Sequence, residues 1–255
     1  MPASPSPIPK TSDEPPSPRA ALLTGLRRRW HNVRLCFGYA TYYLSKGLFV
    51  LAIGPLIPFL LPFPRAKHHV LSTVTYRYLG LLSRWFLPAC GIYDVIEIRN
   101  VETARAQQPA VFVANHRSRM DAPFLLGLLP RTGALIKAYE GRQFSFNLLM
   151  RHFNYVSIDP TRLSSVNQAI TRARQILAGG RSLLVFPEGT RASSARLQPF
   201  GAFAFQLARD AGVPLVPAVV HSVWPFMARI PGSYFPPARN AFRVRFLDPE
   251  LPRPD

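Results

Sequence analysis

A histidine and an aspartate five positions apart follow an apolar run that is typical of a buried strand. An imidazole such as His116 can accept a proton near neutral pH, and a carboxylate such as Asp121 can fix its tautomer and stabilise the imidazolium. The pair could therefore activate a hydroxyl group. A structural interpretation is also open. Asp121 can cap the helix expected after it, Ser118 can complete a capping box, and His116 can be a hydrogen-bonded structural residue.

A second polar turn follows a later apolar run and carries groups suited to an anionic ligand. It reads Phe-Pro-Glu-Gly-Thr-Arg over residues 186–191. Gly189 lets the backbone approach a ligand closely, Thr190 and the main-chain amides can donate to oxygen, and Arg191 can hold a phosphate through two parallel hydrogen bonds. We expect Glu188 to organise this turn. The alternative is an ordinary strand-terminal turn with an exposed ion pair.

Taken together, the two turns resemble the glycerolipid acyltransferase family, whose bacterial type is 1-acyl-glycerol-3-phosphate acyltransferase. The pattern Asn-His-x-Ser-x-x-Asp, which contains the His-x4-Asp pair, is followed by Phe-Pro-Glu-Gly-Thr-Arg. The resemblance covers about residues 91–220. Lys137 matches a basic position after the third strand, residues 158–159 match a strand-end motif, and residues 212–217 match the last block of the family. The family's N-terminal membrane-embedding helix pair fits residues 33–62.

The resemblance implies direct acyl transfer onto the free hydroxyl of a lysophospholipid, most simply 1-acyl-sn-glycerol-3-phosphate, without a covalent acyl-enzyme. His116, held by Asp121, would take the proton of the acceptor hydroxyl, and Arg191 with Lys137 would bind the acceptor phosphate. The rest of the binding pocket would be formed by Phe186, Glu188, Gly189 and Thr190. No cofactor is implied. The co-substrate would be a thioester of acyl carrier protein or of coenzyme A.

Three departures from the family pattern leave the acceptor open. Pro160 follows Asp159 where the family has arginine, and the nearest basic residue is Arg162. Residues 199–203 lack a lysine and shift a glycine, and residues 147–152 lack the usual proline and glycine. Because these positions lie near the expected acceptor site, another acceptor such as a lyso-ornithine lipid is an alternative. A non-catalytic lipid-binding relative is disfavoured because both members of the acid–base pair are present.

The elements that would position these turns alternate between strand and helix, as in an α/β sheet layered by helices. We expect a mixed, largely parallel sheet of about seven strands, and ligands collect where the strands of such sheets end. The expected strands are residues 93–98, 110–114, 134–137, 155–158, 182–186, 215–220 and 242–246. The expected helices are residues 122–129, 142–152, 165–179 and 201–211.

The N-terminal part differs in texture and predicts a membrane association region. Residues 1–20 are rich in proline and serine and are expected to be a disordered tail. Residues 21–91 would associate with the membrane, and residues 92–255 would form the acyltransferase domain. Residues 47–64 carry no charge but include prolines, and basic residues flank them, which favours a bent re-entrant helix pair. A buried core helix is the alternative interpretation.

The net charge of +18 predicts a polyanionic partner or an anionic surface. A phospholipid bilayer fits better than nucleic acid, because the sequence has neither a clustered basic stripe with aromatic residues nor a groove-reading motif. The two cysteines, Cys36 and Cys90, match no disulfide or metal spacing, and no second histidine lies at ligand spacing from His116. The spacing therefore predicts no metal site, and the resemblance implies a membrane-associated enzyme, expected at the cytoplasmic face of the bacterial inner membrane.

Overall fold

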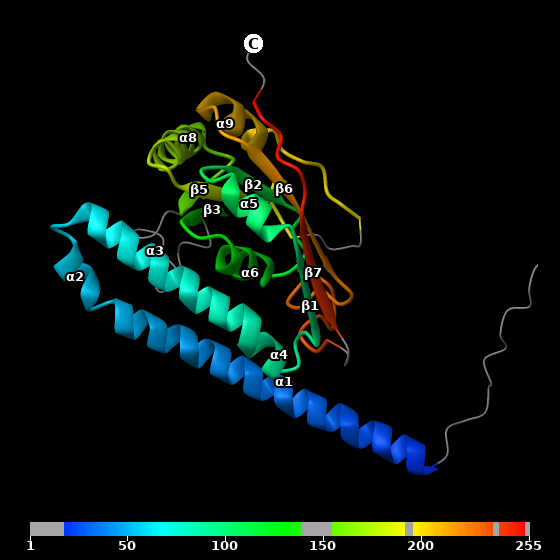
Figure 1. Ribbon diagram of the computed structural model, residues 1–255. Helices are drawn as coiled ribbons and strands as arrows, with labels where there is room; N and C mark the ends of the chain where they lie inside the picture. Colours follow the sequence, from blue (N-terminus) through cyan, green and yellow to red (C-terminus); the bar gives the residue numbers. More distant parts are fainter. Residues whose placement is uncertain (1–17, 139–154, 192–195, 237–239, 253–255) are drawn as a thin grey trace, which may run out of the picture.

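The computed structural model describes residues 18–138, 155–191, 196–236 and 240–252 (Figure 1). Its N-terminal region is a helical hairpin. The helices of this region are α1 (Pro18–Ile53), α2 (Leu56–Leu60), α3 (Pro64–Leu81), the π-helix η1 (Leu82–Phe86) and α4 (Leu87–Ala89). Of the tail expected at residues 1–20, the last three residues begin α1 and the others lie outside the described residues. Gly54 and Pro55 interrupt the hairpin where α1 ends, because proline cannot donate the backbone hydrogen bond that would continue the helix.

The two arms of the hairpin, α1 and α3, contact each other through side chains near the C-terminal end of α1. The rings of Phe49 and Tyr78 stack with their centroids 4.3 Å apart, and Ser45 Oγ lies 3.1 Å from the Tyr78 hydroxyl. Near the middle of α1, a Cβ on Gly38 would come within 2.6 Å of Cys90 Cβ, so the absence of a side chain permits the close approach. Figure 1 shows α1 beside α3 as the outermost layer, running on beyond the sheet.

Helix α1 is exposed along most of its length. Its segment Leu23–Ile53 is long and apolar enough to cross a membrane, and only 11% of its most apolar window is buried. The core helix of a soluble protein would be mostly buried, so the alternative of a buried core helix is not supported. This apolar N-terminal helix could anchor the chain in a membrane.

The rest of the chain folds around a seven-stranded mixed sheet, as the sequence predicted. The strands are β1 (Val95–Arg99), β2 (Val111–Ala114), β3 (Thr132–Lys137), β4 (Val156–Ile158), β5 (Ser182–Val185), β6 (Leu215–Ser222) and β7 (Ala241–Phe246). They lie in the order β1-β7-β6-β2-β5-β3-β4, and every neighbouring pair is parallel except β6 with β7.

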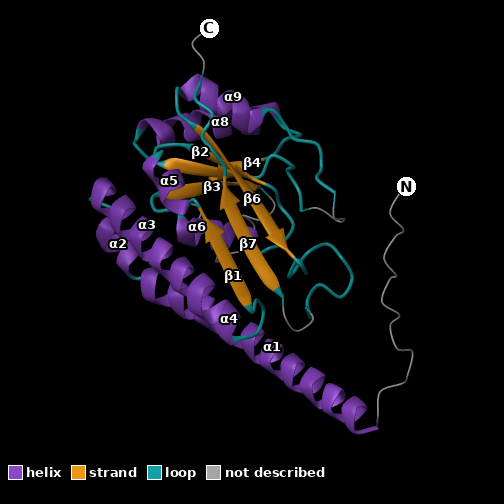
Figure 2. Cartoon of the chain, turned by 45° about the vertical axis from the view of Figure 1, so that its right-hand side comes forward, coloured by secondary structure: helices purple, strands orange, loops and turns teal. Residues whose placement is uncertain are grey.

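Helices cover both faces of this sheet (Figures 1 and 2). They are α5 (Val101–Ala106), α6 (Asp121–Leu128), α8 (Leu163–Ala178) and α9 (Phe203–Ala211). Because side chains alternate along a strand, Val111 and Val113 pack in a core with α8 and α9, whereas Phe112 and Ala114 pack in the core shared with α6. Helix α6 in turn contacts α3, so the hairpin forms the outer layer on that side.

The helices agree less closely with expectation than the strands do. The short helix α5 was not expected, and the helix expected at residues 142–152 lies outside the described residues. Helix α6 begins one residue earlier than expected, at Asp121, which places this carboxylate in the first turn. Pro123 also lies in the first turn, where its missing N–H costs no intrahelical hydrogen bond.

The strand register explains why two distant turns meet. Val113 of β2 pairs with Val185 of β5, and the two strands run parallel. The residues three positions further on, His116 and Glu188, therefore leave the sheet side by side at its carboxyl edge. Ligand sites of open α/β sheets lie at this edge.

Candidate active site

His116 and Asp121 form a hydrogen-bonded pair at the carboxyl end of β2. Nδ1 of His116 lies 3.0 Å from Oδ2 of Asp121. The imidazole keeps 19% of its side-chain surface exposed, whereas the carboxylate is 1% exposed. With Nδ1 bound to the carboxylate, Nε2 is the ring nitrogen left to exchange a proton with a ligand. The arrangement is that of a general base held by a buried carboxylate.

The carboxylate of Asp121 does more than hold the imidazole. The same oxygen, Oδ2, accepts hydrogen bonds from the backbone N–H groups of Arg117 and Ser118, each at 2.7 Å. The residue before α6 is Met120, and it makes no side-chain cap. Asp121 is therefore not the N-cap of the helix. Of the capping box with Ser118 only one half is formed, because Asp121 accepts the N–H of Ser118 while Ser118 Oγ accepts the N–H of Met120 instead of that of Asp121. The carboxylate instead fixes the turn that carries His116.

Glu188 joins the second turn to the first. Its Oε1 accepts the backbone N–H of His116 at 2.7 Å, and its Oε2 accepts that of Gln198 at 3.0 Å. Glu188 as a residue is 8% exposed. Both partners lie outside its own turn, so Glu188 fixes the backbone of His116 and of Gln198.

Two further polar residues of the first turn have supporting roles. The side-chain amide of Asn115 donates to the carbonyl of Val220 at 2.8 Å and accepts its N–H at 2.7 Å, which prolongs the pairing of β2 with β6. Ser118 donates through Oγ to the carbonyl of Phe226 and accepts the N–H of Met120 at 3.0 Å. The motif residues around His116 therefore hold the backbone rather than face a ligand.

Aromatic rings surround the pair on its inner side. Phe186 stacks on the His116 imidazole with ring centroids 4.0 Å apart. Tyr93 is fully buried, and first this burial and then the negative charge of Asp121 raise the pKa of its hydroxyl. The Tyr93 hydroxyl therefore stays protonated and neutral, and it adds no second negative charge to the site.

A cavity of about 470 Å³ opens in front of His116. Its walls come from α1, from the turn after β2, from the ends of β3, β4 and β5, and from the loop after β6. The charged residues of its wall, besides His116, are all cationic: Lys46, Arg119, Lys137, Arg191 and Arg229. Among the lining residues that the structure describes, none is acidic.

The predicted site residues fall into two groups around this cavity. Those that line it are His116, Lys137, Phe186, Gly189, Thr190 and Arg191. Asp121 and Glu188 do not line it and lie behind, where they hold the histidine. Gly189 has a φ of +63°, a conformation that glycine adopts without strain. Arg191 donates through a guanidinium nitrogen to the carbonyl of Met227 at 2.7 Å, which fixes its position in the wall.

Three cations of the wall were not found from the sequence. Arg119 is a variable position within the histidine motif, and Arg229 lies in the loop after β6, where no pattern marked it. Lys46 lies in the N-terminal segment that the sequence assigns to membrane association, and no motif marks it. A signal was nevertheless available, because Tyr42 and Lys46 are four residues apart and therefore share one face of α1.

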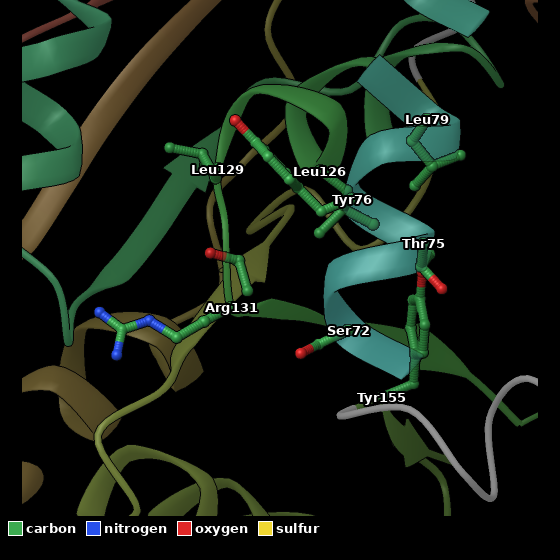
Figure 3. A pocket seen from close by; sticks show the side chains of 9 residues that line it. Ser72, Thr75, Tyr76, Leu79, Leu126, Leu129, Arg131 and Tyr155 are labelled. Carbon is green, nitrogen blue, oxygen red and sulfur yellow. The ribbon is translucent and has the colours of Figure 1, made fainter. Parts of the chain in front are cut away.

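The structure has a smaller pocket between α3 and the segment after α6 (Figure 3). Its lining includes Ser72, Tyr76, Leu129 and Arg131. The cavity volume is about 20 Å³, room for about one water molecule. It contains no acid–base pair. Within the described ranges no group of three or more histidine, cysteine or acidic residues could hold a metal ion.

Comparisons with known proteins match the part of the chain that carries both turns. A family model described as Acyltransferase matches residues 95–221, which include both turns. A 1-acyl-sn-glycerol-3-phosphate acyltransferase from Cocos nucifera is 27% identical over 221 residues, and the alignment covers 85% of this chain and 66% of the relative. The Mus musculus enzyme named 1-acyl-sn-glycerol-3-phosphate acyltransferase alpha is 30% identical over 169 residues, covering 65% of this chain and 59% of that protein. This chain thus spans about two thirds or less of these two relatives.

A solved structure has the same fold. It is that of the 1-acyl-sn-glycerophosphate (LPA) acyltransferase PlsC from Thermotoga maritima, with a TM-score of 0.66 and 22% identity. The match covers 89% of this chain and 87% of that one. The fold, the paired histidine and aspartate, and the matched family model define the class. This chain belongs to the acyltransferase family.

Proposed function

We propose that this protein transfers a fatty acyl chain from a thioester donor to the free hydroxyl of 1-acyl-sn-glycerol-3-phosphate and so makes phosphatidic acid. The observation that carries the proposal is the His116–Asp121 pair at the wall of a cavity whose other charged lining residues are cations. The names of the coconut and mouse relatives, both 1-acyl-sn-glycerol-3-phosphate acyltransferases, support the same substrate.

In the proposed reaction His116 acts as a general base. Its Nε2 takes the proton of the acceptor hydroxyl as that oxygen attacks the thioester carbonyl, and Asp121 stabilises the imidazolium that forms. The carbon–sulfur bond then breaks, and the proton passes from the imidazolium to the departing thiolate. The ester bond that forms replaces the thioester bond that breaks, and the proton of the hydroxyl ends on the thiol. No covalent acyl-enzyme is needed. Glu188 contributes by holding the backbone of His116, because catalysis depends on its position relative to both lipids.

The charge of the cavity wall favours an acceptor with a net negative head group. Arg191 and Lys137 are the proposed ligands of the acceptor phosphate, and Arg can hold a phosphate with two hydrogen bonds. A zwitterionic acceptor such as a lyso-ornithine lipid would bring an ammonium group as well. Because the described lining offers that ammonium group no carboxylate, we rank this acceptor second. A non-catalytic role is disfavoured by the formed His116–Asp121 pair.

The cavity also has apolar walls that suit an acyl chain, including Leu135, Ile136, Ile158 and Phe203. The donor would be acyl carrier protein or coenzyme A charged with a fatty acid, and no other cofactor takes part in the proposed step. We further propose that α1 and α2 dock in the bilayer at the cytoplasmic face of the inner membrane. Large apolar residues exposed on these helices, such as Phe59 at 78%, support docking in a bilayer.

The test is an acyl-transfer assay with purified protein in detergent. Labelled acyl-coenzyme A or acyl carrier protein is offered with lysophosphatidate, monoacylglycerol, lyso-ornithine lipid or lysophosphatidylcholine. We expect labelled phosphatidic acid as the main product, and kcat/KM for lysophosphatidate to exceed the other values by at least tenfold. Preferred acylation of lyso-ornithine lipid would replace the acceptor, and transfer to none of the four would contradict the proposed function.

A further inference from the structure

Lys46 is the single charged residue within residues 35–64, the most apolar stretch of the chain. A lysine at the centre of a bilayer-embedded helix costs about 2.5 to 3.5 kcal/mol unless it reaches water or an anionic partner. The surroundings of Lys46 must therefore offset the cost of placing its charge in an apolar segment. It lies within the segment Leu23–Ile53, which is long and apolar enough to enter a membrane.

The two faces of α1 around Lys46 have opposite character. Lys46 is half-buried and lines the cavity, as does Tyr42 one turn before it. Leu44, Leu48 and Leu51 are instead 61%, 57% and 73% exposed. Helix α1 therefore forms a wall between the cavity and the outside. Its outer face is apolar, and its inner face carries Lys46, which lines the same cavity as His116.

The neighbours of Lys46 in the wall also suit an anion. Arg119, on the turn that carries His116, lies within electrostatic range of the Tyr42 phenol. Both residues line the cavity, and no described lining residue is acidic. A phosphate monoester carries a charge of about −1.5 to −2 near pH 7. More than one cation is needed to neutralise it, and Lys46 is the cation that the membrane-facing helix contributes.

We infer that Lys46 binds the head-group phosphate of the lysophospholipid acceptor and is a specificity-determining residue. This inference rests on the proposed function and extends it, because the acceptor would be selected partly by the helix that docks in the bilayer. The phosphate of a lipid acceptor lies at the membrane interface, where α1 is proposed to dock. An acceptor with the same free hydroxyl but no phosphate gains nothing from Lys46.

The experiment compares Lys46→Met with Lys46→Arg and with Lys67→Met. Methionine keeps the length of the side chain and removes the charge. Lys67 belongs to α3 of the same hairpin and does not line the cavity, so Lys67→Met is the matched control. For each variant, KM is measured for lysophosphatidate and for acyl-coenzyme A, together with kcat/KM for monoacylglycerol and with vesicle flotation.

We expect Lys46→Met to raise KM for lysophosphatidate roughly 10- to 100-fold, the loss of one charge-assisted hydrogen bond. The values for acyl-coenzyme A and monoacylglycerol should stay within about threefold, because neither substrate gains binding energy from Lys46 in this proposal. Lys46→Arg should restore most of the affinity, and Lys67→Met should behave as the wild type. An unchanged KM for lysophosphatidate would overturn the inference. A raised KM for acyl-coenzyme A alone would overturn it too, because Lys46 would then bind the phosphate of the donor.

Two further readouts separate this inference from the function itself. If Lys46→Met fails to float with vesicles while Lys67→Met floats, Lys46 positions α1 at the membrane and does not bind the head group. The inference then fails. Binding of labelled lysophosphatidate to the purified protein is measured directly as well. Wild-type protein that neither binds nor acylates lysophosphatidate refutes both proposals. Wild-type protein that acylates it, with Lys46→Met equal to the wild type in affinity, refutes only the role of Lys46.

Discussion

Replacement of Asp121 by asparagine probes how the carboxylate serves the base. One oxygen of Asp121 accepts hydrogen bonds from His116 Nδ1 at 3.0 Å and from the N–H groups of Arg117 and Ser118 at 2.7 Å each. An asparagine amide has one oxygen, and the two backbone donors compel that oxygen into the same place. The NH₂ group must then occupy the position of Oδ1, which is buried and has no hydrogen-bond partner in the described part of the chain.

The expected effect on kcat follows from this fixed orientation. The His116 tautomer is preserved, and only the negative charge behind the imidazolium is lost. A hydrogen bond to a charged group contributes about 1.5 to 3 kcal/mol, against about 0.5 to 1.5 for a neutral one. The imidazolium also loses the stabilisation that the negative charge of Asp121 provides. With both losses, we expect Asp121→Asn to lower kcat roughly 10- to 150-fold, at about 1.4 kcal/mol for each factor of ten. An asparagine that inverts the tautomer costs about 10⁴-fold in serine proteases.

The assay is acyl transfer at saturating donor and lysophosphatidate, with thermal unfolding in detergent as the control for folding. The buried NH₂ group without an acceptor should lower the free energy of unfolding by about 1 to 3 kcal/mol. Asp121→Ala should be less stable still, because it leaves the N–H groups of Arg117 and Ser118 without acceptors. A 10⁴-fold fall in kcat for folded Asp121→Asn would refute the tautomer argument. An unchanged kcat would refute any electrostatic role of the carboxylate.

Substitutions of three other residues test the phosphate site, the packing of α3 on α6, and membrane docking. Arg191→Ala should raise KM for lysophosphatidate roughly 10- to 100-fold with a smaller effect on kcat, and an unchanged KM would remove Arg191 from the phosphate site. Gly127→Ala should lower the free energy of unfolding by about 1 to 3 kcal/mol in thermal melts. The new Cβ would meet Leu79 C at 2.7 Å and Gly80 N at 2.8 Å, and wild-type stability would mean that α3 and α6 separate easily. Leu48→Glu should impair vesicle flotation while activity in detergent persists, and normal flotation would contradict docking through the outer face of α1.

The sheet could be predicted because its strands are short apolar runs bounded by turns. All seven were found within a few residues, including β2 and β5, whose ends carry the two polar turns. The meeting of His116 with Glu188 requires the register of Val113 with Val185, which pattern alone does not give. The proximity of the two turns is implied by the resemblance to a known family rather than by the pattern of the strands. The short helix α5 was missed because six residues give too little periodicity to recognise.

The roles of individual site residues were harder to predict than their presence. Asp121 fits the composition of an N-cap equally well, and only its contacts with three donors assign it to the histidine turn. The contribution of α1 to the cavity was not predicted, because the sequence suggests a membrane role for every residue of an apolar segment. Lys46 and Arg229 reach the cavity only through the packing of the hairpin and of the loop after β6. Such long-range placement is a property of tertiary packing rather than of local pattern.

The most direct test of the central claim is acyl transfer by His116→Ala. Detergent-purified wild type and variant are given labelled acyl-coenzyme A and lysophosphatidate under identical conditions, and labelled phosphatidic acid is quantified. We predict that the variant binds vesicles and melts as the wild type does but loses about 10²- to 10⁴-fold in turnover, the range expected for a removed general base. Retention of wild-type turnover by the folded variant would contradict the assignment of His116 as the base.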